Sequence, residues 1–366
     1  MTIELANISI TSEEITFLRN TCPYLSDAYL QFLETFKLRP SIHVKVTFTP
    51  VGGKNHEEEE KGDAHIDIQG LWLDTILYEI PLLALTSEAY FRFCDEDWTH
   101  DGQEEKAYEK GTRLLEHGCV FSEFGTRRRR DYHTMELLIR GLTRAATDAE
   151  EKGYTGKLSG TSNVHFAMKH GIPPVGTVAH EWFMGVASIT NDYQHASETA
   201  LRYWVGSFGE GVLGIALTDT FGTPTFLKAF KQTMPNIAEA EAKKESVTIL
   251  RPDALRPAMK ESVVVDVPSS AKPSAHSFAL QTHPRSYAQT FPGVRQDSGD
   301  PLEFVNVMRN FYDEEGIQEK KTIVFSDSLN VDKCIQYKEA AEKAGFNPTF
   351  GIGTFFSSRP PITLCY

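Results

Sequence analysis

The stretch 321–345, KTIVFSDSLNVDKCIQYKEAAEKAG, runs from a short apolar segment through a polar turn into a helical pattern. A strand, a turn and a helix in this order make one β/α unit. From Gly118 onward the chain repeats this rhythm, and seven units predict a β/α barrel with its functional side chains at the carboxyl ends of the strands. An open doubly wound sheet is the alternative. The six other strand-and-turn segments are VFSEFGT (120–126), LSGTSN (158–163), PPVGTVAHEW (173–182), VLGIALTDTFGT (212–223), GVRQDSGDP (293–301) and TFGIGTFF (349–356).

Residues 1–115 follow a different pattern, which predicts a smaller α/β domain ahead of a barrel domain at 116–356. Its helices are predicted from periodicity and, at Thr11, from a capping box with Glu14. Two alternating apolar and polar runs predict an antiparallel hairpin. The predicted elements are helices at Thr11–Arg19 and Ser26–Phe36, strands at 43–48 and 65–72, and a buried helix within 73–93 that is interrupted near Pro81.

One segment, 236–289, breaks the rhythm of the barrel. It is rich in Ala, Ser, Pro and Lys and has no sustained periodicity. Long stretches of this kind between structured units are typical of disordered insertions. We therefore predict a surface insertion with no catalytic role.

Composition excludes several classes of protein. The 366 residues carry 50 acidic and 37 basic side chains, a net charge of −13, which argues against general nucleic-acid binding. No apolar run approaches the length of a membrane span, and the five cysteines show no CxxC spacing. These features predict a soluble cytoplasmic protein; the RRRR run at 127–130 leaves a nuclear-localisation patch, and so a nuclear location, as an alternative.

The four arginines of FSEFGTRRRR (121–130) stand immediately before a predicted helix. Cations are disfavoured at a helix N-terminus, because the helix dipole is positive there. Four of them in succession therefore predict an anionic ligand at this place. Together with the acids, hydroxyls and glycines of the other strand ends, they suit a phosphorylated substrate with a divalent cation.

His180 stands at the tip of the third unit in the sequence HEWFM (180–184). This is not a zinc-protease helix, because Met184 occupies the place of the second histidine. A buried histidine satisfied by its neighbours is the ordinary interpretation. Beside Glu181 and a phosphate site, a nucleophilic or phosphorylatable histidine is the other.

In this order, the motifs FSEFGTRRRR, SGTSN, GTVAHEW, LTDTFGT, GVRQDSGDP, FSDSLN and FGIGT closely resemble the nicotinate phosphoribosyltransferases of fungi, over roughly 8–231 and 291–356. The resemblance implies a type II phosphoribosyltransferase, with an irregular α/β barrel, a smaller α/β domain and usually a homodimer. The implied reaction joins nicotinic acid to the phosphoribose of phosphoribosyl pyrophosphate, in NAD salvage. It is coupled to ATP hydrolysis and uses Mg²⁺.

The resemblance also implies a role for each matching residue. Phe124 stacks on the pyridine ring, and Arg127 and Arg295 bind the anionic substrates, for which the guanidinium geometry is suited. Asp219 and Asp297 hold ribose hydroxyls or Mg²⁺, with Asp297 the candidate metal ligand, and His180 is phosphorylated from ATP. The other implied substrate-binding residues are Gly125, Thr126, Ser162, Ser326, Asp327, Gly351, Gly353 and Thr354.

The chain departs from the family pattern at both ends. It begins downstream of the D-x-Y-K-like motif with which members usually start, and residues 357–366 form a divergent tail. We therefore expect a chain truncated at both ends, with an incomplete N-terminal domain and weak or no activity. Two alternatives stay open: an impaired relative that binds ligand or partner subunits without turnover, and a quinolinate-type phosphoribosyltransferase.

Overall fold

The computed structural model describes residues 2–51, 62–234 and 285–357. The chain divides into two units, each described by itself below. The first comprises Met1–Thr177, Gly293–Arg309 and Glu319–Tyr366, and the second comprises Val178–Pro292 and Asn310–Gln318.

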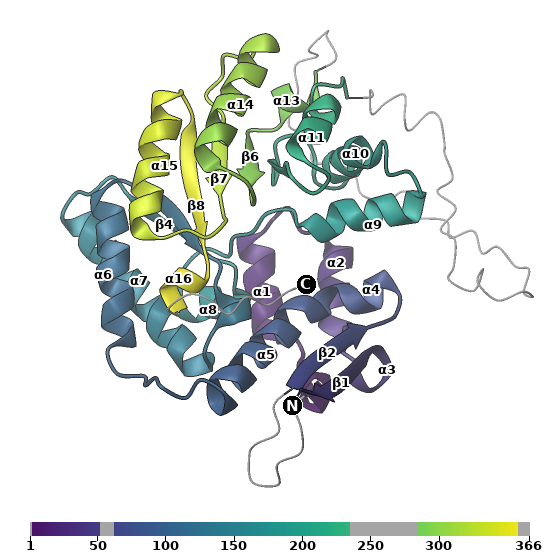
Figure 1. Cartoon of the computed structure of the whole chain (residues 1–366), viewed down its shortest axis with the longest axis vertical. Coiled ribbons are helices and arrows are strands. Elements are labelled where there is room, and N and C mark those ends of the chain that lie inside the picture. Colours follow the sequence, from purple (N-terminus) through teal and green to yellow (C-terminus); the bar gives the residue numbers. More distant parts are fainter. Residues whose placement is uncertain (1, 52–61, 235–284, 358–366) are drawn as a thin grey trace, which may run out of the picture. The chain divides into compact units, whose positions relative to one another are not determined.

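A parallel sheet forms the centre of the first unit (Figure 1). Its strands run in the order β4-β3-β8-β7-β6, and because they are parallel their carboxyl ends meet at one edge. Phe121 of β3 lies opposite Phe350 of β8 and both are buried, as is typical of parallel strands covered on both faces. The bounds are β3 Val120–Glu123, β4 Lys157–Thr161, β6 Gly293–Gln296, β7 Thr322–Phe325 and β8 Asn347–Ile352.

Helices follow these strands, and polar caps fix where several of them begin. Asp131 accepts a hydrogen bond from the Thr134 backbone N–H and caps α7, and Asn163 and Asn330 cap α8 and α15 in the same way. Helices α6 and α7 pack against each other (Figure 1). The bounds are α6 Gln103–Glu116, α7 Tyr132–Glu151, α8 Val164–His170, α14 Pro301–Glu314, α15 Val331–Lys343 and α16 Thr354–Ser357.

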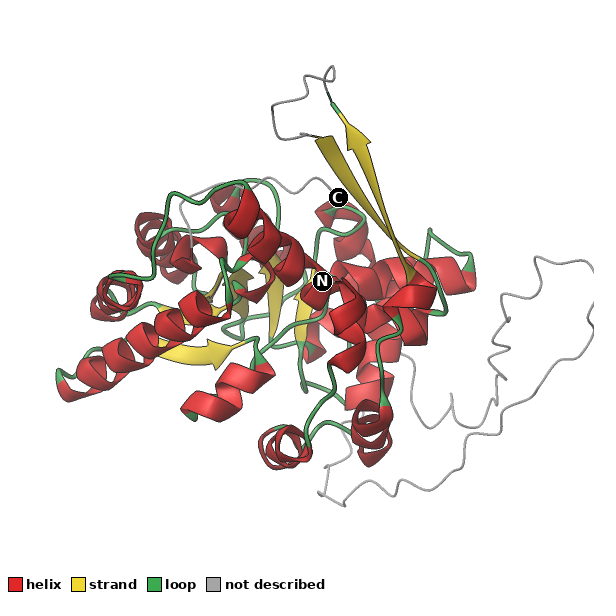
Figure 2. Ribbon diagram, turned by 90° about the horizontal axis from the view of Figure 1, so that it is seen from below, coloured by secondary structure: helices red, strands yellow, loops and turns green. Residues whose placement is uncertain are grey.

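The N-terminal part of the first unit confirms the predicted helices and hairpin. The Thr11–Glu14 capping box is present, and β1 pairs antiparallel with β2 from Val44–Ile68 to Pro50–Gly62. Figure 2 shows these two strands extending beyond the neighbouring helices. The elements are η1 Thr2–Asn7, α1 Ser12–Thr21, α2 Asp27–Thr35, α3 Pro40–His43, β1 Val44–Pro50, β2 Gly62–Ile68, α4 Trp72–Thr75, η2 Ile76–Tyr78 and α5 Glu79–Phe93.

Two local predictions in the first unit are wrong. The helix predicted within 73–93 is interrupted at η2, and not at Pro81, which lies in the first turn of α5 where a missing N–H costs nothing. The segment 173–182, predicted as a strand and turn, contributes only a bridge between Pro174 and Thr161 and no strand. Two consecutive prolines lack the N–H groups that a longer ladder needs.

The second unit is built mainly from helices around an aromatic core. The Phe230 ring packs against those of Phe226, Phe291 and Phe311, with centroids 4.8, 5.8 and 6.1 Å away. Such ring pairs add to the stabilisation from burying apolar area. The elements are α9 His180–Thr190, α10 Ala196–Phe208, β5 Ile215–Leu217, α11 Thr223–Phe230 and α13 Tyr287–Thr290.

Most of the predicted insertion, 236–284, lies outside the described residues, as do 358–366 of the predicted tail. The described end of the insertion is structured. Tyr287 of α13 is fully buried, and its hydroxyl donates a hydrogen bond to Glu198 at 2.7 Å. The boundary predicted at 289 therefore falls inside a packed segment.

The predicted α/β class, with a parallel sheet and an N-terminal domain, is confirmed. Within the three described ranges, the structure has no helix of the length and apolarity that a membrane span requires.

Candidate functional site

The predicted site residues fall into two groups. All except His180 and Asp219 belong to the first unit, where they lie at or just beyond the carboxyl ends of its strands; those two belong to the second unit. The two groups are described separately.

Phe124 follows β3 and is held by β8. Its backbone N–H donates to the Ile352 carbonyl at 2.8 Å, and its ring lies directly over Gly351. A Cβ added at Gly351 would lie 2.6 Å from that ring, so only glycine leaves room for it. Gly351 lies inside β8, and neither it nor Gly353 has a positive φ. Gly351 therefore accommodates the aromatic ring, and Gly353 lies between the end of β8 and the start of α16.

A buried carboxylate that the sequence reasoning missed lies beside Phe124. Glu123, the last residue of β3, is fully buried and accepts hydrogen bonds from the Gly125 N–H and the Thr161 hydroxyl. Burial raises the pKa of Glu123 to about 7, while the two hydrogen bonds act in the opposite direction. An acid two positions after the buried Phe121, on the same face of the strand, was the available signal.

Arg295 is enclosed by polar groups at the ends of β6 and β7. Its Nε donates to Ser326 Oγ at 2.8 Å, and its Nη2 donates to Asp297 Oδ2 at 2.8 Å. Its Nη1 donates to Thr177 Oγ1 at 2.7 Å, a contact that the sequence did not suggest. Ser326 Oγ in turn donates to Asp297 Oδ1 at 2.6 Å. Three predicted site residues thus form one network, in which the Arg295 and Asp297 side chains are only 14% and 19% exposed.

Two members of the arginine run, Arg129 and Arg130, contact other side chains of the first unit. Arg129 Nε donates to Glu88 of α5 at 2.8 Å, and Arg130 stacks on Phe91 and Trp98 at 5.2 and 5.3 Å. The N-cap acid Asp131, rather than an external anion, supplies the negative charge at the start of α7.

Arg127 belongs to η3 (Thr126–Arg128) and differs from Arg129 and Arg130. It makes a 3.2 Å contact with Glu79, and both side chains are about two-fifths exposed, at 38% and 42%. An exposed pair of this kind is weak and easily exchanged for another anion. Arg127 is therefore a member of the run that remains available to a ligand.

The remaining carboxylates at the strand ends are the candidate metal ligands of the first unit. Among the described residues, no group of three or more His, Cys, Asp or Glu side chains is arranged to hold a metal ion. Asp300 instead caps α14, accepting from the N–H groups of Leu302 and Glu303. Asp297 remains a single carboxylate next to a cation, which fits Mg²⁺ only if the substrate supplies most of the ligands.

His180 and Asp219 come together in the second unit. His180 is the first residue of α9, and its Nδ1 lies 3.0 Å from the Thr220 hydroxyl. Its Nε2 lies 4.0 Å from Asp219 Oδ1, and the side chains are 39% and 7% exposed respectively. The histidine is therefore oriented but accessible, which disfavours the interpretation as a buried structural residue. Thr220 is a second neighbour that the sequence reasoning missed.

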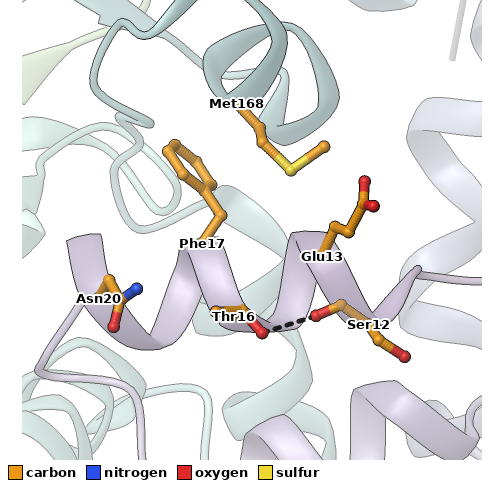
Figure 3. A pocket seen from close by; sticks show the side chains of 6 residues that line it. All are labelled: Ser12, Glu13, Thr16, Phe17, Asn20 and Met168. Atoms are coloured by element: carbon orange, nitrogen blue, oxygen red, sulfur yellow. Dashed lines mark hydrogen bonds between the residues drawn. The ribbon is translucent and has the colours of Figure 1, made fainter.

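A surface hollow elsewhere in the first unit contains none of the predicted residues. Figure 3 shows that it lies along α1, with Met168 of α8 facing Phe17 across it. Its lining has one charged side chain, Glu13, and no cation to bind a phosphate. It is not the candidate site.

Family models match most of the chain. The nicotinate phosphoribosyltransferase family model matches residues 119–254 and 271–362, and the model of the N-terminal domain of that family matches residues 2–87.

Relatives match over nearly the whole chain. The "Probable nicotinate phosphoribosyltransferase" of Schizosaccharomyces pombe is 41% identical over 355 residues, covering 97% of this chain and 72% of its own length. The nicotinate phosphoribosyltransferase of Saccharomyces cerevisiae is 39% identical and covers 91% of this chain. This chain spans only 65% of the length of that relative.

Solved structures match in the same way. The crystal structure of the Saccharomyces cerevisiae protein has a TM-score of 0.77 at 39% identity, and the match covers 98% of this chain and 73% of that one. The nicotinate phosphoribosyltransferase of Porphyromonas gingivalis has a TM-score of 0.72 at 27% identity, with 100% and 75% covered.

Proposed function

The chain belongs to the nicotinate phosphoribosyltransferase family of enzymes, and we propose that it joins nicotinic acid to the phosphoribose of phosphoribosyl pyrophosphate. The products are nicotinate mononucleotide and pyrophosphate, in NAD salvage. The observation that carries this proposal is the Arg295 network, a cation held by three side chains at the edge where the strands end. A cation fixed in advance binds an anionic substrate without first being ordered.

The residues of the first unit divide the work of binding. Phe124, its ring positioned over Gly351, stacks on the pyridine ring of nicotinate. Arg127 exchanges its exposed contact with Glu79 for a substrate oxygen, and Arg295 binds a phosphate or carboxylate. The residues that surround the 5′-phosphate lie at the ends of β7 and β8 and offer hydroxyls and backbone N–H groups: Ser326, Asp327 through its backbone N–H, Gly351, Gly353 and Thr354.

The transfer itself needs no nucleophile from the protein. The ring nitrogen of nicotinate attacks C1 of the ribose while pyrophosphate leaves, through an oxocarbenium-like state. The positive charge of Arg295 favours departure of pyrophosphate, and the carboxylate of Asp297 is placed to hold a ribose hydroxyl. Asp297 would be the protein ligand of a Mg²⁺ ion that the pyrophosphate brings, and such an ion would neutralise part of the pyrophosphate charge.

In the second unit, His180 accepts a phosphoryl group from ATP. The Thr220 hydroxyl at Nδ1 orients the ring, and the Asp219 carboxylate stabilises positive charge on it. Phosphorylation of His180 couples ATP hydrolysis to the transfer. The histidine forms no bond to the ribose, and the group that leaves C1 is pyrophosphate. A slow transfer without ATP therefore survives its removal.

The test combines product formation with detection of phosphohistidine. Purified chain with labelled nicotinate, phosphoribosyl pyrophosphate, Mg²⁺ and ATP is expected to form nicotinate mononucleotide, and labelled ATP is expected to give an acid-labile phosphoenzyme. His180→Ala should abolish the phosphoenzyme, while His195→Ala should retain it. His195 is a matched control because it is an exposed histidine of the same unit that pairs with Asp192. Unchanged phosphoenzyme in His180→Ala would refute its role.

Further measurements on the same purified protein address the assembly and the alternatives. We propose a cytoplasmic homodimer, which light scattering would show as twice the 41.1 kDa chain mass. Binding of phosphoribosyl pyrophosphate without turnover would identify a relative that only binds ligand. Turnover of quinolinate in place of nicotinate would identify the quinolinate-type activity.

A further inference from the structure

We infer that Glu123 is a positioning residue, whose carboxylate holds the substrate-binding turns after β3 and β4 in register with each other. The inference rests on the proposed function for the identity of the substrates. Its geometric basis is independent of them, because it concerns only how the two turns are fixed.

The carboxylate of Glu123 closes a ring of hydrogen bonds across the sheet edge. One oxygen accepts from the Gly125 N–H and the other accepts from the Thr161 hydroxyl at 2.6 Å. Thr161 Oγ1 accepts from the Asn163 N–H at 3.2 Å, and Asn163 Nδ2 donates to Thr126 Oγ1 at 3.1 Å. The ring therefore returns to the turn from which it began.

This ring contains or adjoins the residues that are to hold substrate. Gly125 and Thr126 belong to it, and Ser162 joins it through its backbone N–H, which donates to the Glu123 carbonyl at 2.9 Å. Phe124 and Arg127 flank the turn on its two sides. A shift of the turn would displace all of them together, which is how a residue away from the substrate can affect binding.

The turn is also closely packed. A Cβ added at Gly125 would lie 2.8 Å from a carboxylate oxygen of Glu123 and 3.0 Å from the Gly353 carbonyl. The turn after β3 thus has no room for a side chain at position 125 beside the carboxylate and the backbone that follows β8. An apolar side chain at 123 would leave a buried N–H and a buried hydroxyl without their acceptors, and the turn would move to satisfy them.

Solvent and titrating neighbours have little part in this arrangement. Glu123 is fully buried, and besides burial the groups that influence its pKa are the Gly125 N–H and the Thr161 hydroxyl. Neither of these titrates in the working range. Burying an ionisable acid costs stability, so its presence calls for a functional explanation.

Hydrogen exchange and kinetics of three variants test the inference. In Glu123→Leu we expect the backbone amides of 121–130 and 158–166 to exchange at least about tenfold faster than in wild type. The KM for nicotinate should rise at least about tenfold, because one buried charge-assisted contact is lost. Glu123→Gln should restore most of both properties, since its amide keeps one acceptor and one polar contact. Glu104→Gln is the matched control, because that acid pairs with Arg140 and Arg144 between α6 and α7, outside the ring.

The outcomes separate positioning from general stability. The inference is overturned if Glu123→Leu melts within a few degrees of wild type while its amide exchange and its KM for nicotinate equal those of Glu104→Gln. If Glu123→Leu does not fold, Thr161→Val decides: loss of the hydroxyl that donates to Glu123 should speed exchange in the same two segments and raise KM for nicotinate, and exchange and KM equal to those of Glu104→Gln overturn the inference. If the wild type has no transferase activity, the proposed function fails, while local exchange in the two segments still decides the role of Glu123.

Discussion

The carboxyl ends of β3 and β6 each carry an arginine at the same edge of the sheet, but they hold it differently: Arg127 lies in η3 just after β3, and Arg295 lies inside β6. Arg295 at β6 is fixed by Ser326, Asp297 and Thr177 and is mostly buried. Arg127 after β3 has one long, exposed contact with Glu79. At β6 the guanidinium of Arg295 is itself immobilised. After β3, Glu123 holds the backbone of the turn, and the guanidinium of Arg127 stays adaptable.

This difference shows that two arginines of the same predicted role are not energetically equivalent. A cation ordered before binding loses little conformational entropy when the substrate arrives, whereas an exposed one must be ordered at that moment. The hydrogen bonds to Ser326, Thr177 and Asp297 offset the conformational entropy that Arg295 loses when it is ordered before binding. Four substitutions test this distinction, from the largest expected effect to the smallest.

Arg295→Ala should lower kcat/KM by at least about 150-fold, the equivalent of one strong charge-assisted contact of about 3 kcal/mol. It removes the substrate contact and also releases Asp297 and Ser326 from their positions. Steady-state kinetics with varied phosphoribosyl pyrophosphate would measure this. Arg113→Ala, which removes an exposed pair with Asp332, is the control and should change little. Similar losses in both variants would contradict the proposed importance of the network.

Glu123→Gln should change how stability depends on pH. The folded pKa of about 7 lies above the ordinary value of 4.5, so the folded state holds the proton more tightly. The stability contributed by this group is present below pH 4.5 and is lost as the pH rises through about 7. The variant should therefore gain on the order of 3 kcal/mol relative to wild type between those limits. Urea unfolding of both proteins at pH 5 and pH 8 measures it, and parallel pH profiles would show that Glu123 does not titrate there.

Arg127→Ala should lower kcat/KM by about tenfold, since the contact that it forms with substrate is worth about 1.5 kcal/mol. Its stability should change by less than about 0.5 kcal/mol, because an exposed ion pair contributes little. Kinetics and thermal unfolding of one preparation give both numbers. A large loss of melting temperature would mean that Arg127, like Arg129, serves mainly to anchor the turn.

Arg130→Ala should show the reverse pattern. The guanidinium stacks on Phe91 and Trp98, and losing such contacts costs about 0.5–2 kcal/mol of stability. The kcat/KM of the folded protein should stay within about fivefold of wild type, because a change of less than about 1 kcal/mol corresponds to less than about fivefold in rate. Thermal unfolding and kinetics measure the two effects, and an activity loss equal to that of Arg127→Ala would refute the division within the run.

The sequence by itself determined the elements whose causes are local. The capping box at Thr11, the alternation in β1 and β2, and the apolar run followed by a polar turn at β7 each depend on residues within a few positions of one another. Such patterns predict helices, hairpins and β/α units because their periods match those structures. The ordered motifs also identified the family, which the family models confirm.

Tertiary structure alone decided which polar groups meet. Thr177 reaches Arg295 from a segment 118 positions away, and Glu123 reaches Thr161 across 38. No local period encodes such partners, because they depend on how parallel strands are ordered and on which side chain each neighbouring turn presents. The sequence therefore placed arginines and acids at the strand ends, and only the packing of the sheet determined which of them are fixed, which remain available and which buried acid holds the turns together.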